Sequence, residues 1–136
     1  MEFALVLPFL MLIIVIFLDF GRALNYWIDT THLASEGARL AAVDKVPAGS
    51  SSLQTYIRSK ADTGELRDGG SRSVDAPLQV CVNPDGTAVG DPVEVSVTTT
   101  YRWLPLLGLD VATTDITGKA TMRREVLASA VSSGCG

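Results

Sequence analysis

The first 24 residues, MEFALVLPFLMLIIVIFLDFGRAL (1–24), form the most strongly patterned stretch of the chain. Sixteen of them, residues 3–18, carry neither a charge nor a polar side chain. As a helix rising about 1.5 Å per residue, this run is about 24 Å long, slightly short of the ~30 Å hydrocarbon core of a bilayer. Phe20 can extend its reach. The stretch predicts an apolar helix that a membrane can hold.

A secretory signal peptide is the main alternative interpretation. It would have a basic leader before the apolar run and a small-residue cleavage site after it. The run has no basic leader, and it continues into DFGRALNYWIDTTHLASEGARLAAVD (19–44) without such a site. We therefore expect the apolar segment to remain in the mature protein.

The helical pattern extends well beyond the apolar run, because residues 19–43 contain no proline. Small residues recur on one face of this second half: Ala34, Gly37, Ala38, Ala41 and Ala42. Polar residues fall on the other faces: Asn25, Asp29, His32, Glu36 and Arg39. The sequence predicts one long helix, apolar all round at its start and amphipathic later. Pro8 should kink it, since the proline ring clashes with the carbonyl four residues earlier.

Three later segments alternate as strands do. PLQVCVN (77–83) and PVEVSVTTTYRW (92–103) are separated by two turn signals and predict a long-looped hairpin, and DITGKATMRRE (115–125) predicts a third strand. A short helix is expected after Ser52, and TGELRDGGSRSVDAP (63–77) is expected to be a flexible polar connection.

One face of the predicted sheet is apolar and needs a cover, which the second half of the long helix can provide. The sequence therefore predicts an α+β fold in which a long N-terminal helix carries a small antiparallel sheet on its C-terminal half. Residues 1–23 would project as an apolar stalk, and residues 24–136 would form the head. The chain's 136 residues suit one such domain.

Two cysteines, Cys81 and Cys135, lie far apart in the sequence without the paired spacing of a metal site. In an exported domain they predict one disulfide, which would tie the C-terminal tail to the first strand on the face opposite its valines. Two free buried thiols are the alternative.

Little in the sequence suggests catalysis or a cofactor. The single histidine, His32, lies mid-helix with no nucleophile beside it, and Asp62, Glu65 and Asp68 suggest a solvated surface. The net charge of −4 argues against nucleic acid as a partner, since nothing would neutralise the phosphates. We expect a protein that is not an enzyme and that binds no metal or cofactor.

WLPLLGLD (103–110) is an apolar connection that is costly to leave in water. It either folds back as a lid on the head's own core or contacts a neighbouring subunit or a membrane surface. Its candidate contact residues are Trp103, Leu104, Leu106 and Leu107.

The charges of the opening stretch also suggest assembly. A carboxylate in an apolar environment costs several kcal/mol unless it is paired. In a bundle of such helices, Glu2 of one copy can neutralise the N-terminal ammonium of another. Asp19 and Arg22 lie three residues apart and can pair along one helix face, where the apolar run meets the head.

These residues resemble the N-terminal signature of TadE-like proteins, relatives of type IV pilins in tight-adherence systems. The matching positions are Glu2, Phe3, Ala4, Leu5, Val6, Leu7 and Pro8, followed by Asp19, Phe20, Gly21 and Arg22. ASEGARLAAV (34–43) and the later strands are similar in a looser way.

The resemblance implies a structural subunit of a bacterial extracellular filament used for adhesion, either its main component or a minor one. Subunits of this kind are cut by a prepilin peptidase, held in the cytoplasmic membrane, and then stacked by an assembly machinery with their helices at the filament centre. Pilins usually carry the assembly glutamate at the fifth mature position, whereas here it is second. A non-polymerising envelope protein whose head binds a partner is the other hypothesis.

Overall fold

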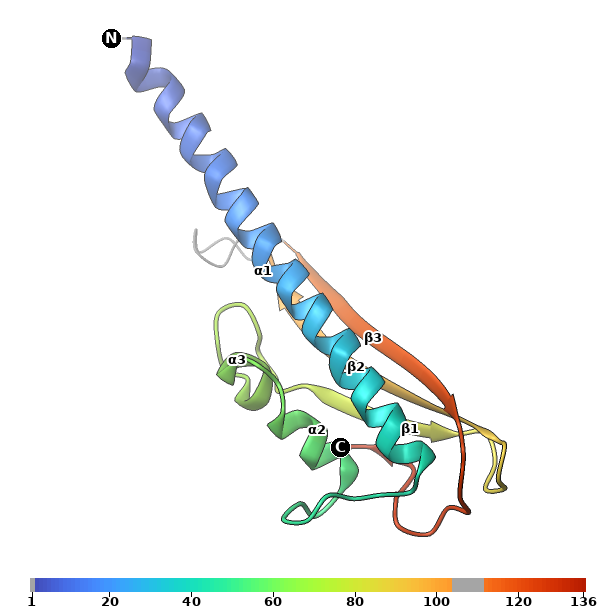
Figure 1. The fold of residues 1–136 in the computed structure, drawn as a ribbon. Helices are drawn as coiled ribbons and strands as arrows, with labels where there is room; N and C mark the ends of the chain where they lie inside the picture. The colour runs from blue at the N-terminus through green and yellow to red at the C-terminus, as the bar shows by residue number, and fades with distance from the viewer. Residues whose placement is uncertain (1, 104–111) are drawn as a thin grey trace.

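The structure, a computed structural model, describes residues 2–103 and 112–136. It is an α+β fold built on one long helix, α1 (Glu2–Ala42). The first half of α1 projects alone, and the second half lies along a curved sheet (Figure 1). The helix is unbroken through Pro8. The predicted stalk and head are therefore confirmed as an architecture, while the kink at Pro8 stays a prediction.

The sheet is antiparallel and has the strand order β3-β2-β1-β4. Its strands are β1 (Gln79–Pro84), β2 (Pro92–Arg102), β3 (Thr113–Arg123) and β4 (Gly134–Cys135). The hairpin of the first two predicted strands is confirmed, with Val82 opposite Val95. The prediction of three strands was incomplete, because the tail adds β4 beside β1.

Two short helices complete the head: α2 (Leu53–Ser59) and α3 (Gly64–Asp68). The Ser52 side chain accepts a hydrogen bond from the Thr55 backbone N–H and so caps α2, as predicted. The prediction of a flexible polar connection over 63–77 missed a short helix, α3, within it. Leu66 of α3 is fully buried and anchors this segment in the core.

The core lies between α1 and the sheet, and the small-residue face of α1 lets the two approach closely. The five small residues predicted to share this face, Ala34, Gly37, Ala38, Ala41 and Ala42, are all buried. A Cβ on Gly118 of β3 would lie 2.4 Å from the backbone carbonyl of Thr30, so β3 contacts the backbone of α1 directly. The alternating side chains of β1 and β2 cover the same face, with the valines inward as predicted.

Asp44 ends α1 and also holds the C-terminal tail. Its φ of 50° is in the left-handed region, and the N–H groups of Asp44 and Lys45 reach back to the carbonyls of Ala41 and Leu40 in a Schellman motif. Its carboxylate accepts backbone N–H bonds from residues 129, 130 and 131 at 2.6–2.8 Å. Burial alone would raise the pKa of Asp44, but these hydrogen bonds outweigh it and lower the pKa to about 2.

We expect Asp44→Asn to lower the free energy of unfolding by about 1 kcal/mol at pH 7, because hydrogen bonds to a partly exposed carboxylate are lost. The Asp44 pKa is depressed from 3.8 in the folded state, so its contribution is complete above pH ~4 and disappears as the pH falls toward 2. Urea unfolding of both proteins between pH 2 and 7 measures this. A difference that stays constant over that range would contradict the assignment, and asparagine keeps the tolerance for left-handed φ that the cap needs.

Candidate functional site

The candidate site is the stalk of α1 together with the junction where the stalk meets the head. Among the described residues, one helix is long and apolar enough to cross a membrane, over Leu5–Ala42. The most apolar 18-residue stretch of this helix has a mean hydropathy of 2.3, and only 6% of that stretch is buried. The core helix of a soluble domain would be mostly buried, so this exposure indicates a segment that needs an external partner.

Asp19 lies at the junction, directly after the apolar run of the stalk in α1. Its exposed fraction is 1%, and the hydroxyl of Tyr101 in β2 donates a hydrogen bond to its carboxylate. The same hydroxyl lies 3.3 Å from the backbone carbonyl oxygen of Asp19. The head therefore supplies a hydrogen bond to this buried carboxylate, which would otherwise be costly to bury.

Three aromatic rings continue this contact across the junction. The ring centroids of Tyr26 and Tyr101 are 5.6 Å apart, those of Tyr101 and Trp103 are 5.2 Å apart, and both pairs meet edge to face. The Tyr26 hydroxyl donates to the carboxylate of Glu65 in α3. The junction thus connects α1, β2 and α3, and Glu65 is a hydrogen-bond partner, not the freely solvated residue predicted.

Tyr101 is held as a hydrogen-bond donor. Burial raises its pKa, and the hydrogen bond to Asp19 raises it further, while the charge of Arg22 acts in the opposite direction. Arg22 itself is exposed, and its predicted pairing with Asp19 stays a prediction. Because its pKa is raised, the Tyr101 hydroxyl stays protonated at physiological pH and remains a hydrogen-bond donor to Asp19.

Asp29 was predicted to lie on a polar face of the amphipathic half of α1, yet the head covers it. Its side chain is buried, and one carboxylate oxygen accepts the backbone N–H of Asp62 at 3.1 Å. This bond ties α1 to the segment between α2 and α3. His32, one helical turn further on, is exposed as predicted.

The other predicted assembly residues lie along α1. Phe3 and Phe20 are exposed apolar side chains, and Gly21 has open space where a Cβ would stand. Glu2 begins the helix, and its backbone alone is described. The structure brings Asp19 and Phe20 to the junction, whereas Glu2, Phe3 and Pro8 lie at the far end of the stalk (Figure 1).

Trp103 is half-buried and packs against the core cluster. Its indole N–H donates to the Thr114 hydroxyl at 2.9 Å. Leu104, Leu106 and Leu107 lie outside the described residues, so both interpretations of WLPLLGLD (103–110) stay open.

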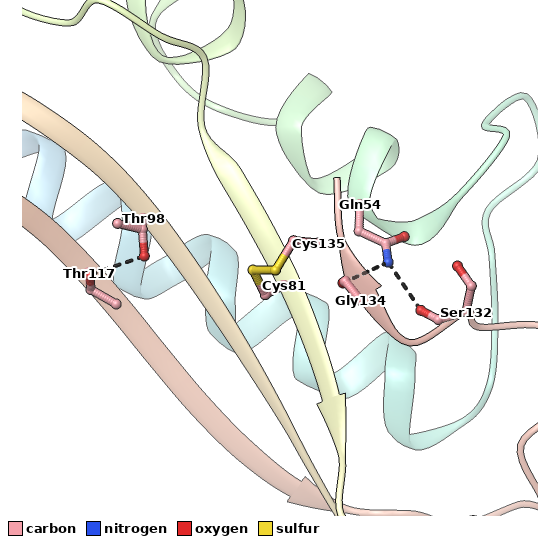
Figure 2. Close-up of a disulfide and its surroundings, with 7 residues drawn as sticks. All are labelled: Gln54, Cys81, Thr98, Thr117, Ser132, Gly134 and Cys135. Carbon is pink, nitrogen blue, oxygen red and sulfur yellow. Dashed lines mark hydrogen bonds between the residues drawn. A yellow bond between two sulfur atoms is a disulfide. The ribbon is translucent and has the colours of Figure 1, made fainter.

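The predicted disulfide joins Cys81 of β1 to Cys135 of β4, at directly opposite positions of the antiparallel pair (Figure 2). The Gln54 side-chain amide of α2 donates to the backbone carbonyls of Ser132 and Gly134 at 3.1 and 3.3 Å. The tail is therefore fixed to the head by a covalent bond and by hydrogen bonds from a helix beside it.

Within the described ranges, 2–103 and 112–136, no group of three or more His, Cys, Asp or Glu side chains is placed to hold a metal ion. The junction combines a buried carboxylate with neutral tyrosines, an arrangement suited to fixing one element against another. It connects the stalk to the part of the head formed by β2 and α3.

Comparison with protein-family models matches residues 1–39 to the family described as TadE-like protein. No curated protein and no solved structure matches the chain. The matched range contains the whole stalk, Asp19 and most of the small-residue face of α1. The resemblance inferred from the sequence is thereby confirmed over residues 1–39, where the chain is similar to TadE-like proteins.

Proposed function

We propose that the chain is a structural subunit of an extracellular, pilus-like filament, and that its copies polymerise through the apolar helix of residues 1–23. The observation that carries the proposal is the uncovered stalk, which projects from the head over residues 3–18 with almost no burial. Leaving so many apolar side chains in water is unfavourable. The TadE-like match over the same residues supports a pilus-type partner for them.

In this proposal the stalk lies in the cytoplasmic membrane before assembly and at the filament centre afterwards. A prepilin peptidase and the pilus assembly machinery are the partners that process and extract the subunit, and the exposed heads serve surface attachment. The TadE-like pilus family is structural, and we assign no enzymatic activity or cofactor to this chain.

Glu2 has a specific role in the proposal. A neighbour's N-terminal ammonium would neutralise its carboxylate within the apolar bundle, where an unpaired charge is costly. Pro8, further along the helix, would adjust stalk packing, since proline removes one backbone donor.

Electron microscopy of fibres sheared from cells, with mass spectrometry of the fibre protein, tests the proposal. We expect the chain in the fibres and a loss of at least about tenfold in fibre yield for Glu2→Ala, because a charge pair worth more than about 1.4 kcal/mol disappears. Glu125→Ala, which removes an exposed carboxylate of the head, is the matched control and should leave the yield unchanged.

The alternative is a non-polymerising envelope protein, or a minor assembly component, whose head binds a partner. A membrane-spanning helix is equally compatible with that function. It is favoured if the chain stays in the membrane fraction and the fibres neither contain it nor respond to Glu2→Ala.

A further inference from the structure

Apolar side chains remain exposed on α1 where the stalk meets the head, from the last turns of the stalk to one turn beyond it. They recur every three or four residues and so share one face of the helix. We call this set the junction strip: Phe17, Phe20, Leu24, Trp27 and Ile28. Trp27 and Ile28 are 53% and 61% exposed although they lie level with the head, whose contacts bury Ala23 and Tyr26 on the other side of the helix.

An open groove of about 360 Å³ lies against this strip. Phe20, Leu24 and Trp27 form its wall on α1, and Trp103 with Ile116 forms the opposite wall on the sheet. Asp115 stands at the groove as well, where its carboxylate accepts a hydrogen bond from Thr100 at 2.7 Å. The groove is therefore mainly apolar and aromatic, with one charged group.

Gly21 lies beside the strip, and no described residue packs closely enough on it to require a glycine. Glycine weakens the interior of a helix relative to alanine. At Gly37 the reason is internal, because a Cβ would lie 2.5 Å from the Ile57 side chain. A Cβ on Gly21 would meet nothing within 4 Å. A glycine with open space around it, in an apolar helix face, is typical of a position that another helix approaches closely.

Lipid does not account for the whole strip. From residue 3 to residue 28 the apolar face is about 39 Å long, against a ~30 Å hydrocarbon core. With residue 3 at one boundary of that core, Trp27 and Ile28 lie outside the other. Deeper insertion would carry Asp115 into the hydrocarbon, which is costly.

The chain exposes more surface than a compact protein of its mass, and the excess is large enough to bind a protein partner. The chain exposes 8149 Å². A compact protein of 14.4 kDa exposes about 6,800 Å². The excess of about 1,300 Å² belongs to one chain, and a standard interface buries only about 800 Å² on each partner, so the uncovered surface is large enough for one. The uncovered apolar side chains of the stalk and of the junction strip are where the structure departs from a compact shape.

We propose that the junction strip and its groove receive the apolar stalk of a second copy of this chain, with Gly21 at the edge of the contact, outside the groove. This inference rests on the proposed function and gives the filament contact a defined place. The stalk suits the groove because residues 3–18 present only apolar side chains, so no buried charge is left unmatched. Burial of Trp27 would supply an aromatic anchor, the kind of side chain that dominates interface energies.

Two variants of the full chain test the proposal, and fibre yield is compared with thermal stability in detergent. Gly21→Leu should lower the yield of sheared fibres by at least about tenfold, since a bulky side chain blocks the close approach. Its thermal midpoint should be equal to or above that of the unchanged protein, because leucine favours helix more than glycine does. Trp27→Ala should lower the yield by at least about fivefold with the midpoint unchanged. Leu127→Ala, which removes an exposed apolar side chain of the C-terminal tail, is the control and should change neither quantity.

Normal fibre yields from both strip variants, with Glu2→Ala still defective, would overturn the strip assignment and leave the filament function intact. Weaker retention in the membrane fraction with unchanged fibre yield would identify lipid as the occupant and also overturn it. A chain that never enters fibres would overturn the inference together with the proposed function.

Discussion

Removing the disulfide with the double variant Cys81→Ser/Cys135→Ser is expected to lower the free energy of unfolding by about 4 kcal/mol. The two cysteines are 54 residues apart, and in the chain-entropy model a closed loop of that length restricts the unfolded state by about this amount. Urea unfolding of the full chain in detergent, followed by tryptophan fluorescence, measures the difference.

Two observations control this measurement. The intact mass of the unchanged protein should rise by two hydrogens on reduction, whereas the double variant should not respond to reductant. Amide exchange at Gly136, whose N–H donates to the Val80 carbonyl at 2.9 Å, should quicken when the cross-link is absent. A stability change below about 1 kcal/mol would show that the Asp44 and Gln54 hydrogen bonds hold the tail without the disulfide.

The strands and their buried faces could be predicted from the sequence because the alternation of side chains is a local pattern. Side chains alternate between faces with a period of two, so the position of Val95 and Val97 follows from Val93. The same alternation placed Cys81 on the face opposite Val80 and Val82, which left it free to reach a tail cysteine. The close packing of α1 on the sheet followed from its small residues in the same way.

The junction could not be predicted, because its partners are distant in the sequence. Tyr101 lies 82 residues from Asp19, and no spacing rule connects them. The local rule offered Arg22, three residues along the same helix. The sequence did contain a chemical signal. A carboxylate at the end of an apolar run needs a hydrogen-bond donor. Tyr101, the last residue of the inward-facing row that begins with Val93 in β2, is a candidate for that donor.

The connection over 63–77 was predicted without its short helix for a similar reason. Its composition is polar, yet two apolar side chains, Leu66 and Val74, enter the core and fix its structure. Thr63 caps the short helix that carries Leu66, accepting its backbone N–H at 3.4 Å. Isolated buried apolar residues such as Leu66 and Val74, set among polar neighbours, give no periodic signal.

The second large effect is expected at the junction, where Tyr101→Phe should lower the free energy of unfolding by about 2–3 kcal/mol. The variant keeps the ring and its contacts with Tyr26 and Trp103, and it removes the hydroxyl that donates to Asp19. A charge-assisted hydrogen bond in a buried site is worth about this much. Because the stalk is joined to the head through this bond, hydrogen exchange over residues 19–26 should also quicken.

A double-mutant cycle with Asp19→Asn separates this bond from general damage to the core. If the hydroxyl acts through the Asp19 carboxylate, the double variant should be less destabilised than the sum of the two single variants, by about 1–2 kcal/mol. Tyr56→Phe, which removes the hydroxyl of a half-buried tyrosine in α2, is the matched control. It should lower the free energy of unfolding by less than about 0.5 kcal/mol. Additive effects would mean that Tyr101 stabilises the head only through its ring. The angle between stalk and head would then depend on the aromatic packing of Tyr26, Tyr101 and Trp103.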